Sequence, residues 1–196
     1  MNKNQIIAGI YNYLNEEINH SAYDLIITND IRVENFFVIN IGVYLKKLVE
    51  TKKIKSFNFQ HTVLLLKPKR IHIDITFTDL NNEETYLELK HFSISGNRGK
   101  GRKLNFYTSN SFEGKKVGII GDCEKFDSLS QNGIIKPEIN KICCAVITPK
   151  PSLEEINAIT AKFSKYSELS NWNLNFQVPF TDQYSKLGFF TLEKIK

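Results

Sequence analysis

Two carboxylates and an ammonium on neighbouring short segments are the residues of this chain best suited to chemistry. Residues 71–78 alternate strictly between apolar and polar types, so that Asp74 lies on the polar face of an expected strand. Residues 84–92 also alternate, and Glu88 and Lys90 share one side of that segment. Carboxylate oxygens suit Mg²⁺, and a bound metal ion lowers the pKa of water. The pattern therefore predicts a site that holds a divalent cation and activates water.

The polar connection between these segments, residues 79–83, predicts a hairpin whose register follows from the hydrophobic pattern. If these five residues form the loop, Thr78 pairs with Glu84, and Asp74 lies opposite Glu88. A slip by one residue would place Asp74 among apolar side chains and is rejected. Opposed like charges destabilise a sheet unless they are compensated, as a metal ion would do. In this register one apolar face is expected to hold Ile71, Ile73, Ile75, Phe77, Leu87 and Leu89.

The same residues also fit a hairpin without a site, because Asp, Glu and Lys are common on any exposed strand face. A further carboxylate adds weight to the site hypothesis. Residues 31–50 have helical periodicity, and Asp30 is placed to cap the helix. Glu34 lies seven residues before Ile41 and so falls on the apolar stripe, where an unpaired carboxylate is costly to bury. Alternatively, Glu34 is solvated in the first turn and stabilised by the helix dipole. The expected stripe comprises Phe37, Ile41, Tyr44 and Leu48.

The order of these segments resembles that of the PD-(D/E)XK nuclease superfamily, which includes many restriction endonucleases. The resemblance covers residues 31–178 and rests on a short motif in an ordered context. One departure is that Ile73, and not proline, precedes Asp74. The order is a helix with Glu34, a strand over 57–66, a strand with Asp74, a strand with Glu88-Leu89-Lys90, a helix, a buried strand and a helix.

The resemblance implies an α/β fold with a central mixed sheet flanked by helices, a core of αβββαβ order and an extra N-terminal helix. It implies that Asp74, Glu88 and the backbone carbonyl of Leu89 hold Mg²⁺, or Mn²⁺ in its place. Lys90 would orient the attacking water or help to deprotonate it. Glu34 would contact a second metal ion or its water shell. The expected organisation is one nuclease-like domain, with a helical extension over 1–30, a core over 31–178 and a C-terminal extension over 179–196.

Further elements follow from local patterns. The segment 112–129 fits either a helix or a short strand, and the resemblance favours a helix. Residues 141–148 form an apolar run typical of a buried strand. Ser152 and Glu155 are spaced as a capping box that opens another helix. Two more elements are expected, an amphipathic helix over 3–18 and a strand over 172–178.

The net charge of +5 and the pI near 9.0 suit a polyanionic partner. The glycine-rich segment 96–103 follows the Lys90 strand and is expected to contact DNA phosphates; a solvated surface loop is the alternative. It lacks a phosphate-loop pattern, so no nucleotide cofactor is expected. Its basic residues are Arg98, Lys100, Arg102 and Lys103.

Together these observations predict a metal-dependent endonuclease of type II restriction-enzyme character, which hydrolyses phosphodiester bonds of double-stranded DNA. A homodimer or successive nicking would make the two cuts. The alternatives are a non-catalytic nucleic-acid-binding or interaction module on the same fold, and a related nuclease acting on RNA, in repair or on mobile elements. Three cysteines without a disulfide framework, and no signal-peptide or membrane-spanning segment, predict a cytoplasmic location.

Overall fold

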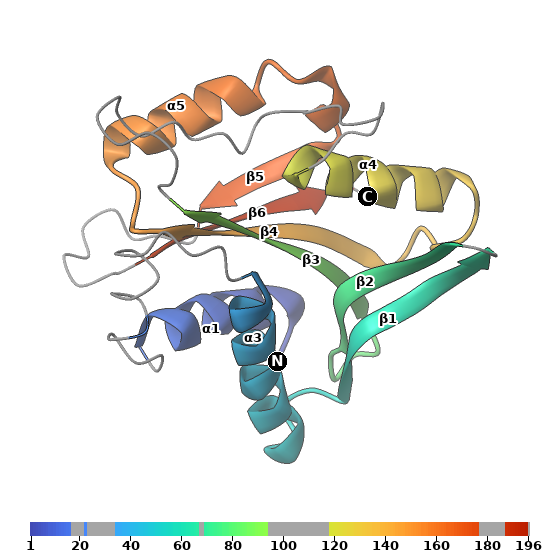
Figure 1. Cartoon of the computed structure of the whole chain (residues 1–196). Helices are drawn as coiled ribbons and strands as arrows, with labels where there is room; N and C mark the ends of the chain where they lie inside the picture. Colours follow the sequence, from blue (N-terminus) through green and yellow to red (C-terminus); the bar gives the residue numbers. More distant parts are fainter. Residues whose placement is uncertain (17–21, 23–33, 67–68, 94–117, 177–186, 196) are drawn as a thin grey trace.

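A six-stranded mixed sheet with helices on both faces forms the centre of the computed structural model (Figure 1). The structure describes residues 1–16, 22, 34–66, 69–93, 118–176 and 187–195. The strand order is β1-β2-β3-β4-β6-β5. The described elements are α1 (Lys3–Glu16), α3 (Glu34–Glu50), β1 (Ser56–Leu66), β2 (Lys69–Thr78), β3 (Glu84–Ser93), α4 (Ile119–Gln131), β4 (Asn140–Thr148), α5 (Leu153–Phe163), η2 (Ser167–Leu169), β5 (Trp172–Phe176) and β6 (Gly188–Lys194). The expected α/β class with a mixed sheet is confirmed.

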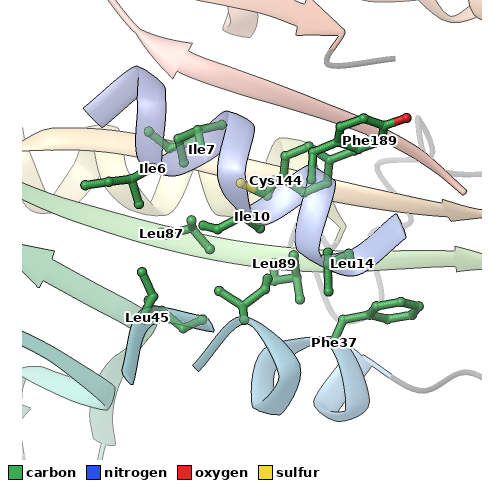
Figure 2. Close-up of a cluster of buried hydrophobic side chains, with 14 of the residues drawn as sticks. Ile6, Ile7, Ile10, Leu14, Phe37, Leu45, Leu87, Leu89, Cys144 and Phe189 are labelled. Atoms are coloured by element: carbon green, nitrogen blue, oxygen red, sulfur yellow. The ribbon is translucent and has the colours of Figure 1, made fainter. Parts of the chain in front are cut away.

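Two apolar clusters, one on each face, hold the helices to the sheet. Figure 2 shows the cluster under α1 and α3, in which the isoleucines of α1 face Leu87 and Leu89 of β3. The amphipathic patterns expected for α1 and α3 are confirmed over their described residues, although Leu45 is fully buried and Tyr44 only partly. The second cluster joins α4 and α5 to the opposite face. Each large apolar side chain buried in this way contributes roughly 1.5–3 kcal/mol.

The β2–β3 hairpin has the register that the hydrophobic pattern predicts. Thr78 pairs with Glu84, and the antiparallel ladder continues to the pair Ile75 and Leu87. The connecting turn is closed by Asp79, whose carboxylate accepts hydrogen bonds from the backbone N–H groups of Asn81 at 2.7 Å and Glu83 at 3.0 Å. This local bonding by an aspartate side chain is typical of tight turns and sets the register from the loop end.

The prediction that β2 has one continuous apolar face is wrong. Ile75 packs in the cluster under α1 and α3, whereas Ile73 packs in the cluster under α4 and α5. The change of face occurs at Asp74, where the ladder to β3 ends and where Gln60 of β1, which lies across from Asp74, has a left-handed φ of 47°. The strand therefore changes the face that it presents to the core on either side of Asp74.

The strand β4 runs parallel to β3 and antiparallel to β6, and every one of its residues is buried. Burial on both faces explains its continuous apolar sequence. The connection to β4 contains α4, so the helix favoured by the resemblance is confirmed over Ile119–Gln131. Gly118 is the N-cap residue of α4, and its φ of 84° is readily adopted by glycine.

At the C-terminal end of the chain, one predicted feature is confirmed and one strand was not predicted. The capping box of α5 forms as expected, with reciprocal bonds between Ser152 and Glu155. The strand β6, within the segment expected to be a C-terminal extension, lies inside the sheet between β4 and β5. Phe189 and Phe190 of β6 are fully buried on opposite faces, so the segment lacks the polar alternation that would have indicated a strand. No helix in the described ranges is long and apolar enough to cross a membrane.

Candidate functional site

The candidate site lies where β2 and β3 part from each other. If their ladder continued beyond Ile75 and Leu87, the N–H of Leu89 would bond to the carbonyl of Ile73. Instead, the N–H of Leu89 donates to Oδ2 of Asp74 at 3.0 Å. The Asp74 carboxylate thus takes the place of a backbone acceptor, and this exchange places its charge between the diverging strands.

The backbone carbonyl of Leu89 faces the same opening. The N–H and C=O of one strand residue point to the same edge, and the N–H of Leu89 points towards Asp74. On its other edge β3 is paired with β4 over this region. The carbonyl oxygen of Leu89 is therefore directed to the side on which Asp74 lies, as the predicted metal site requires.

Glu88 is held in an almost fully buried position by a lysine of α4. The Glu88 side chain is 4% exposed, and its Oε1 lies 2.5 Å from Nζ of Lys125. The same ammonium donates to the backbone carbonyl of His72 in β2 at 3.3 Å. Burial raises the pKa of Glu88 from 4.5 to about 8, against the opposing effect of Lys125 and with added repulsion from Asp74 and Asp122.

Lys90 lies between two further carboxylates. Its Nζ is 3.3 Å from Oε1 of Glu34 and 3.4 Å from Oδ2 of Asp122. Burial lowers the pKa of the Lys90 ammonium, but the carboxylates of Asp122, Glu34 and Asp74 outweigh it and raise the pKa above its ordinary value. Lys90 is therefore a fixed positive charge at neutral pH.

The cluster carries more negative than positive charge. Four carboxylates, Glu34, Asp74, Glu88 and Asp122, interact with two ammonium groups, Lys90 and Lys125. Burial raises the pKa of Asp122 to about 6, although both lysines oppose this change. With all groups ionised, the described cluster has a net charge of −2, which one divalent cation would neutralise.

All four predicted catalytic side chains, Asp74, Glu88, Lys90 and Glu34, belong to this cluster. Glu34 lies in the first turn of α3 and is 39% exposed, so it is partly solvated, and its carboxylate contacts Lys90. The basic residues Arg98, Lys100, Arg102 and Lys103, like the expected cap Asp30, lie outside the described residues.

Three residues of the cluster were not predicted. Gln60 of β1 donates to Asp74 Oδ1 at 3.5 Å, and α4 contributes Asp122 and Lys125. A signal for the α4 pair exists in the sequence, because polar residues three apart share one side of a helix whose apolar side is defined by Cys123 and Phe126. It identifies the polar side of the helix but not the strand residues that this side contacts.

The oxygen donors of the candidate site fit a hard divalent cation. In the described part of the chain, no three His, Cys, Asp or Glu side chains are grouped to hold a metal ion. The predicted set is smaller: it consists of the carboxylates of Asp74 and Glu88 and the carbonyl of Leu89. Mg²⁺ commonly uses one or two carboxylates and keeps several waters, so this donor set is sufficient. Glu88 must exchange its bond to Lys125 to take part.

Comparison of the chain with protein-family models, curated proteins and solved structures found no match.

The raised pKa values predict a pH dependence of stability for the metal-free protein. Native Glu88 keeps a proton that the unfolded chain releases above pH 4.5, so its contribution to stability is full at low pH and is lost as pH rises through about 8. The raised pKa of Asp122 changes stability in the same direction, between pH 3.8 and about pH 6. In EDTA, we expect Glu88→Gln to reduce the loss of stability between pH 5.5 and 8.5 by at least about 1 kcal/mol, or roughly 2–4 °C in Tm.

Thermal unfolding of the two proteins across this pH range measures the effect. Glu83→Gln is the matched control, because Glu83 is exposed in the turn of the same hairpin. Its Tm should follow the wild-type curve. Parallel curves for Glu88→Gln and the wild type would show that Glu88 is ionised in the native state throughout.

Proposed function

We propose that the protein is a metal-dependent endonuclease of the PD-(D/E)XK type, acting on double-stranded DNA. The order α3, β1, β2, β3, α4, β4 agrees with the αβββαβ order that the resemblance implies. The observation that carries the proposal is the exchange at Asp74, whose carboxylate replaces a backbone acceptor for the Leu89 N–H. This exchange, together with the repulsion between Asp74 and Glu88, supports a shared cation site of Asp74, Glu88 and the Leu89 carbonyl.

In the proposed reaction, Asp74, Glu88 and the Leu89 carbonyl would hold Mg²⁺. When bound, this ion would lower the pKa of a water molecule and stabilise negative charge on the scissile phosphate. Lys90 contributes a positive charge next to these groups, because Glu34 and Asp122 fix its ammonium from two sides. Its raised pKa supports the role of orienting water and phosphate, and argues against proton abstraction by Lys90.

The test is cleavage of supercoiled plasmid by the purified protein in Mg²⁺ or Mn²⁺, with EDTA as the control. We expect nicked and linear products in either metal and intact plasmid in EDTA. Methylated and unmethylated plasmids are both tested. A structured RNA is included to check the choice of DNA as the substrate. Absence of metal-dependent cleavage of every substrate would contradict the enzyme proposal, and cleavage of RNA alone would contradict the choice of DNA.

The segment 96–103 is proposed to contact the DNA backbone, which leads to a quantitative prediction. Replacing its four basic residues with alanine removes up to four phosphate contacts. We expect weaker binding to all DNA sequences and a slope of log K against log salt that is smaller in magnitude by up to about 3.6. Fluorescence anisotropy between 50 and 300 mM salt measures this slope. An unchanged slope would mean that the segment does not contact phosphates. The residues replaced are Arg98, Lys100, Arg102 and Lys103.

A nucleic-acid-binding module without cleavage is the second candidate. The ion pair between Glu88 and Lys125 favours it, because Glu88 is already neutralised without a metal ion. The excess of negative charge in the cluster favours the enzyme, since a binding module gains nothing from burying unbalanced carboxylates. The plasmid assay separates the two, because a binding module would retard DNA and leave it intact in Mg²⁺.

A further inference from the structure

The ammonium of Lys125 spans the opening between the two parting strands. Its Nζ lies 2.5 Å from Oε1 of Glu88 in β3 and 3.3 Å from the carbonyl oxygen of His72 in β2. One partner belongs to each strand, and the two residues flank the place where Asp74 interrupts the ladder. A positive group held between a carboxylate and a carbonyl oxygen occupies the kind of position that a small cation would take.

The packing of α4 explains why two charged residues reach this place. The helix is fixed to the sheet by its buried side, which includes Cys123 and Phe126. Asp122 and Lys125 are three residues apart and therefore project from one side of the helix. Asp122 meets Lys90 while Lys125 meets Glu88, so α4 delivers one negative and one positive charge to the cluster.

The Lys125 side chain keeps access to solvent. It is 28% exposed, whereas the Glu88 side chain with which it pairs is 4% exposed. A lysine ammonium on a flexible stem exchanges partners readily, because its three donors rotate and are strongly hydrated. Glu88 is thus shielded from solvent, whereas Lys125, which pairs with it, remains in contact with solvent.

We infer that Lys125 is a displaceable partner of the candidate metal site, which holds the Glu88 carboxyl group in the metal-free protein and releases it when a divalent cation binds. The inference rests on the proposed function, since it requires a cation to bind at Glu88. The ammonium and a divalent cation repel each other and compete for the same carboxylate oxygen. Once released, Lys125 remains beside the opening, where it is available to a substrate phosphate.

The direct test follows the Lys125 side chain by NMR during a Mg²⁺ titration. Lysine is labelled with ¹³C at Cε, and the Lys125 signal is identified by its loss in Lys125→Arg. We expect this signal to move to the position of a solvated lysine, with the same midpoint as Mg²⁺ binding measured by calorimetry. Lys194 is the internal control: it pairs with Asp127 of the same helix at 2.7 Å, away from the cluster, and its signal should stay unchanged.

The outcomes separate this inference from the proposed function. If Mg²⁺ binds in a manner that Asp74→Asn abolishes, yet the Lys125 signal does not move, the counterion inference is overturned and the metal site stands. If calorimetry detects no Mg²⁺ binding to the wild type, the proposed function fails and the inference fails with it.

A second measurement uses DNA affinity in Ca²⁺ and in EDTA, with Lys125→Met and the matched variant Lys194→Met. Release of Lys125 predicts that Lys125→Met weakens DNA binding about fivefold in Ca²⁺ and leaves it unchanged in EDTA. Lys194→Met should bind as the wild type does in both conditions. An equal loss for Lys125→Met in Ca²⁺ and EDTA would show a structural role independent of the metal and would overturn the inference.

Discussion

Asp74→Asn should reduce Mg²⁺-dependent DNA cleavage by about 10³-fold or more. The change removes one of the two carboxylates proposed to hold the metal ion, and a loss of about 4 kcal/mol of transition-state stabilisation corresponds to this factor. The amide oxygen of asparagine can still accept the N–H of Leu89, so the strand geometry that Asp74 supports should persist. Cleavage rates of a labelled duplex at saturating Mg²⁺ measure the effect.

Glu83→Gln is the control for this experiment, because it makes the same carboxylate-to-amide change at an exposed position of the same hairpin. We expect its cleavage rate to equal that of the wild type. Circular dichroism and thermal unfolding establish that both variants are folded. A folded Asp74→Asn protein that cleaves DNA as fast as Glu83→Gln would place the active site elsewhere.

Lys90→Met should impair both cleavage and stability, and a second substitution should restore only stability. The loss of the fixed positive charge is expected to slow cleavage by roughly 10²–10³-fold. It also leaves the Asp122 carboxylate, whose side chain is 14% exposed, without its ion-pair partner. We expect unfolding free energy to fall by about 2 kcal/mol at pH 8, less than for a completely buried pair because Lys90 is partly exposed.

The double variant Lys90→Met/Asp122→Asn removes both charges of this pair. Its stability should recover most of the loss, because the carboxylate that would remain unpaired is gone, whereas its cleavage rate should stay low. Denaturant unfolding and single-turnover cleavage give the two quantities. Lys194→Met is the matched control, since Lys194 pairs with Asp127 at similar exposure outside the cluster. Recovery of both properties in the double variant would show that Lys90 acts through stability alone.

The hairpin illustrates how far the sequence determines the site. The polar loop 79–83 and the alternation in β3 predict the register from Thr78 and Glu84 to Ile75 and Leu87, which the structure confirms. The alternation in β2 also predicts that Ile73 and Ile75 share one apolar face, and this prediction fails at Asp74. The failure coincides with tertiary features, namely the left-handed backbone of Gln60 in β1 and the bond from the Leu89 N–H to Asp74. Neither is encoded in the pattern of β2 itself.

The helix α4 shows that a sequence pattern can predict an element without predicting its contacts. Its existence agrees with the resemblance, and its apolar spacing identifies the side that packs on the sheet. The contacts of Asp122 with Lys90 and of Lys125 with Glu88 depend on where the helix crosses the sheet, which local spacing does not determine. β6 was missed for a related reason, because burial of both faces removes the alternation by which a strand is recognised.

Asp74 and Glu88, with the carbonyl of Leu89, are proposed to form one divalent-cation site where β2 and β3 part. Calorimetric titration of Mn²⁺ or Mg²⁺ at pH 8.5, without DNA, tests it most directly, because it needs no knowledge of the substrate. We expect saturable binding to the wild type and to Glu83→Gln, and affinity at least about 100-fold weaker in both Asp74→Asn and Glu88→Gln. Binding that is unchanged by these two substitutions, or no binding to the wild type, would contradict it.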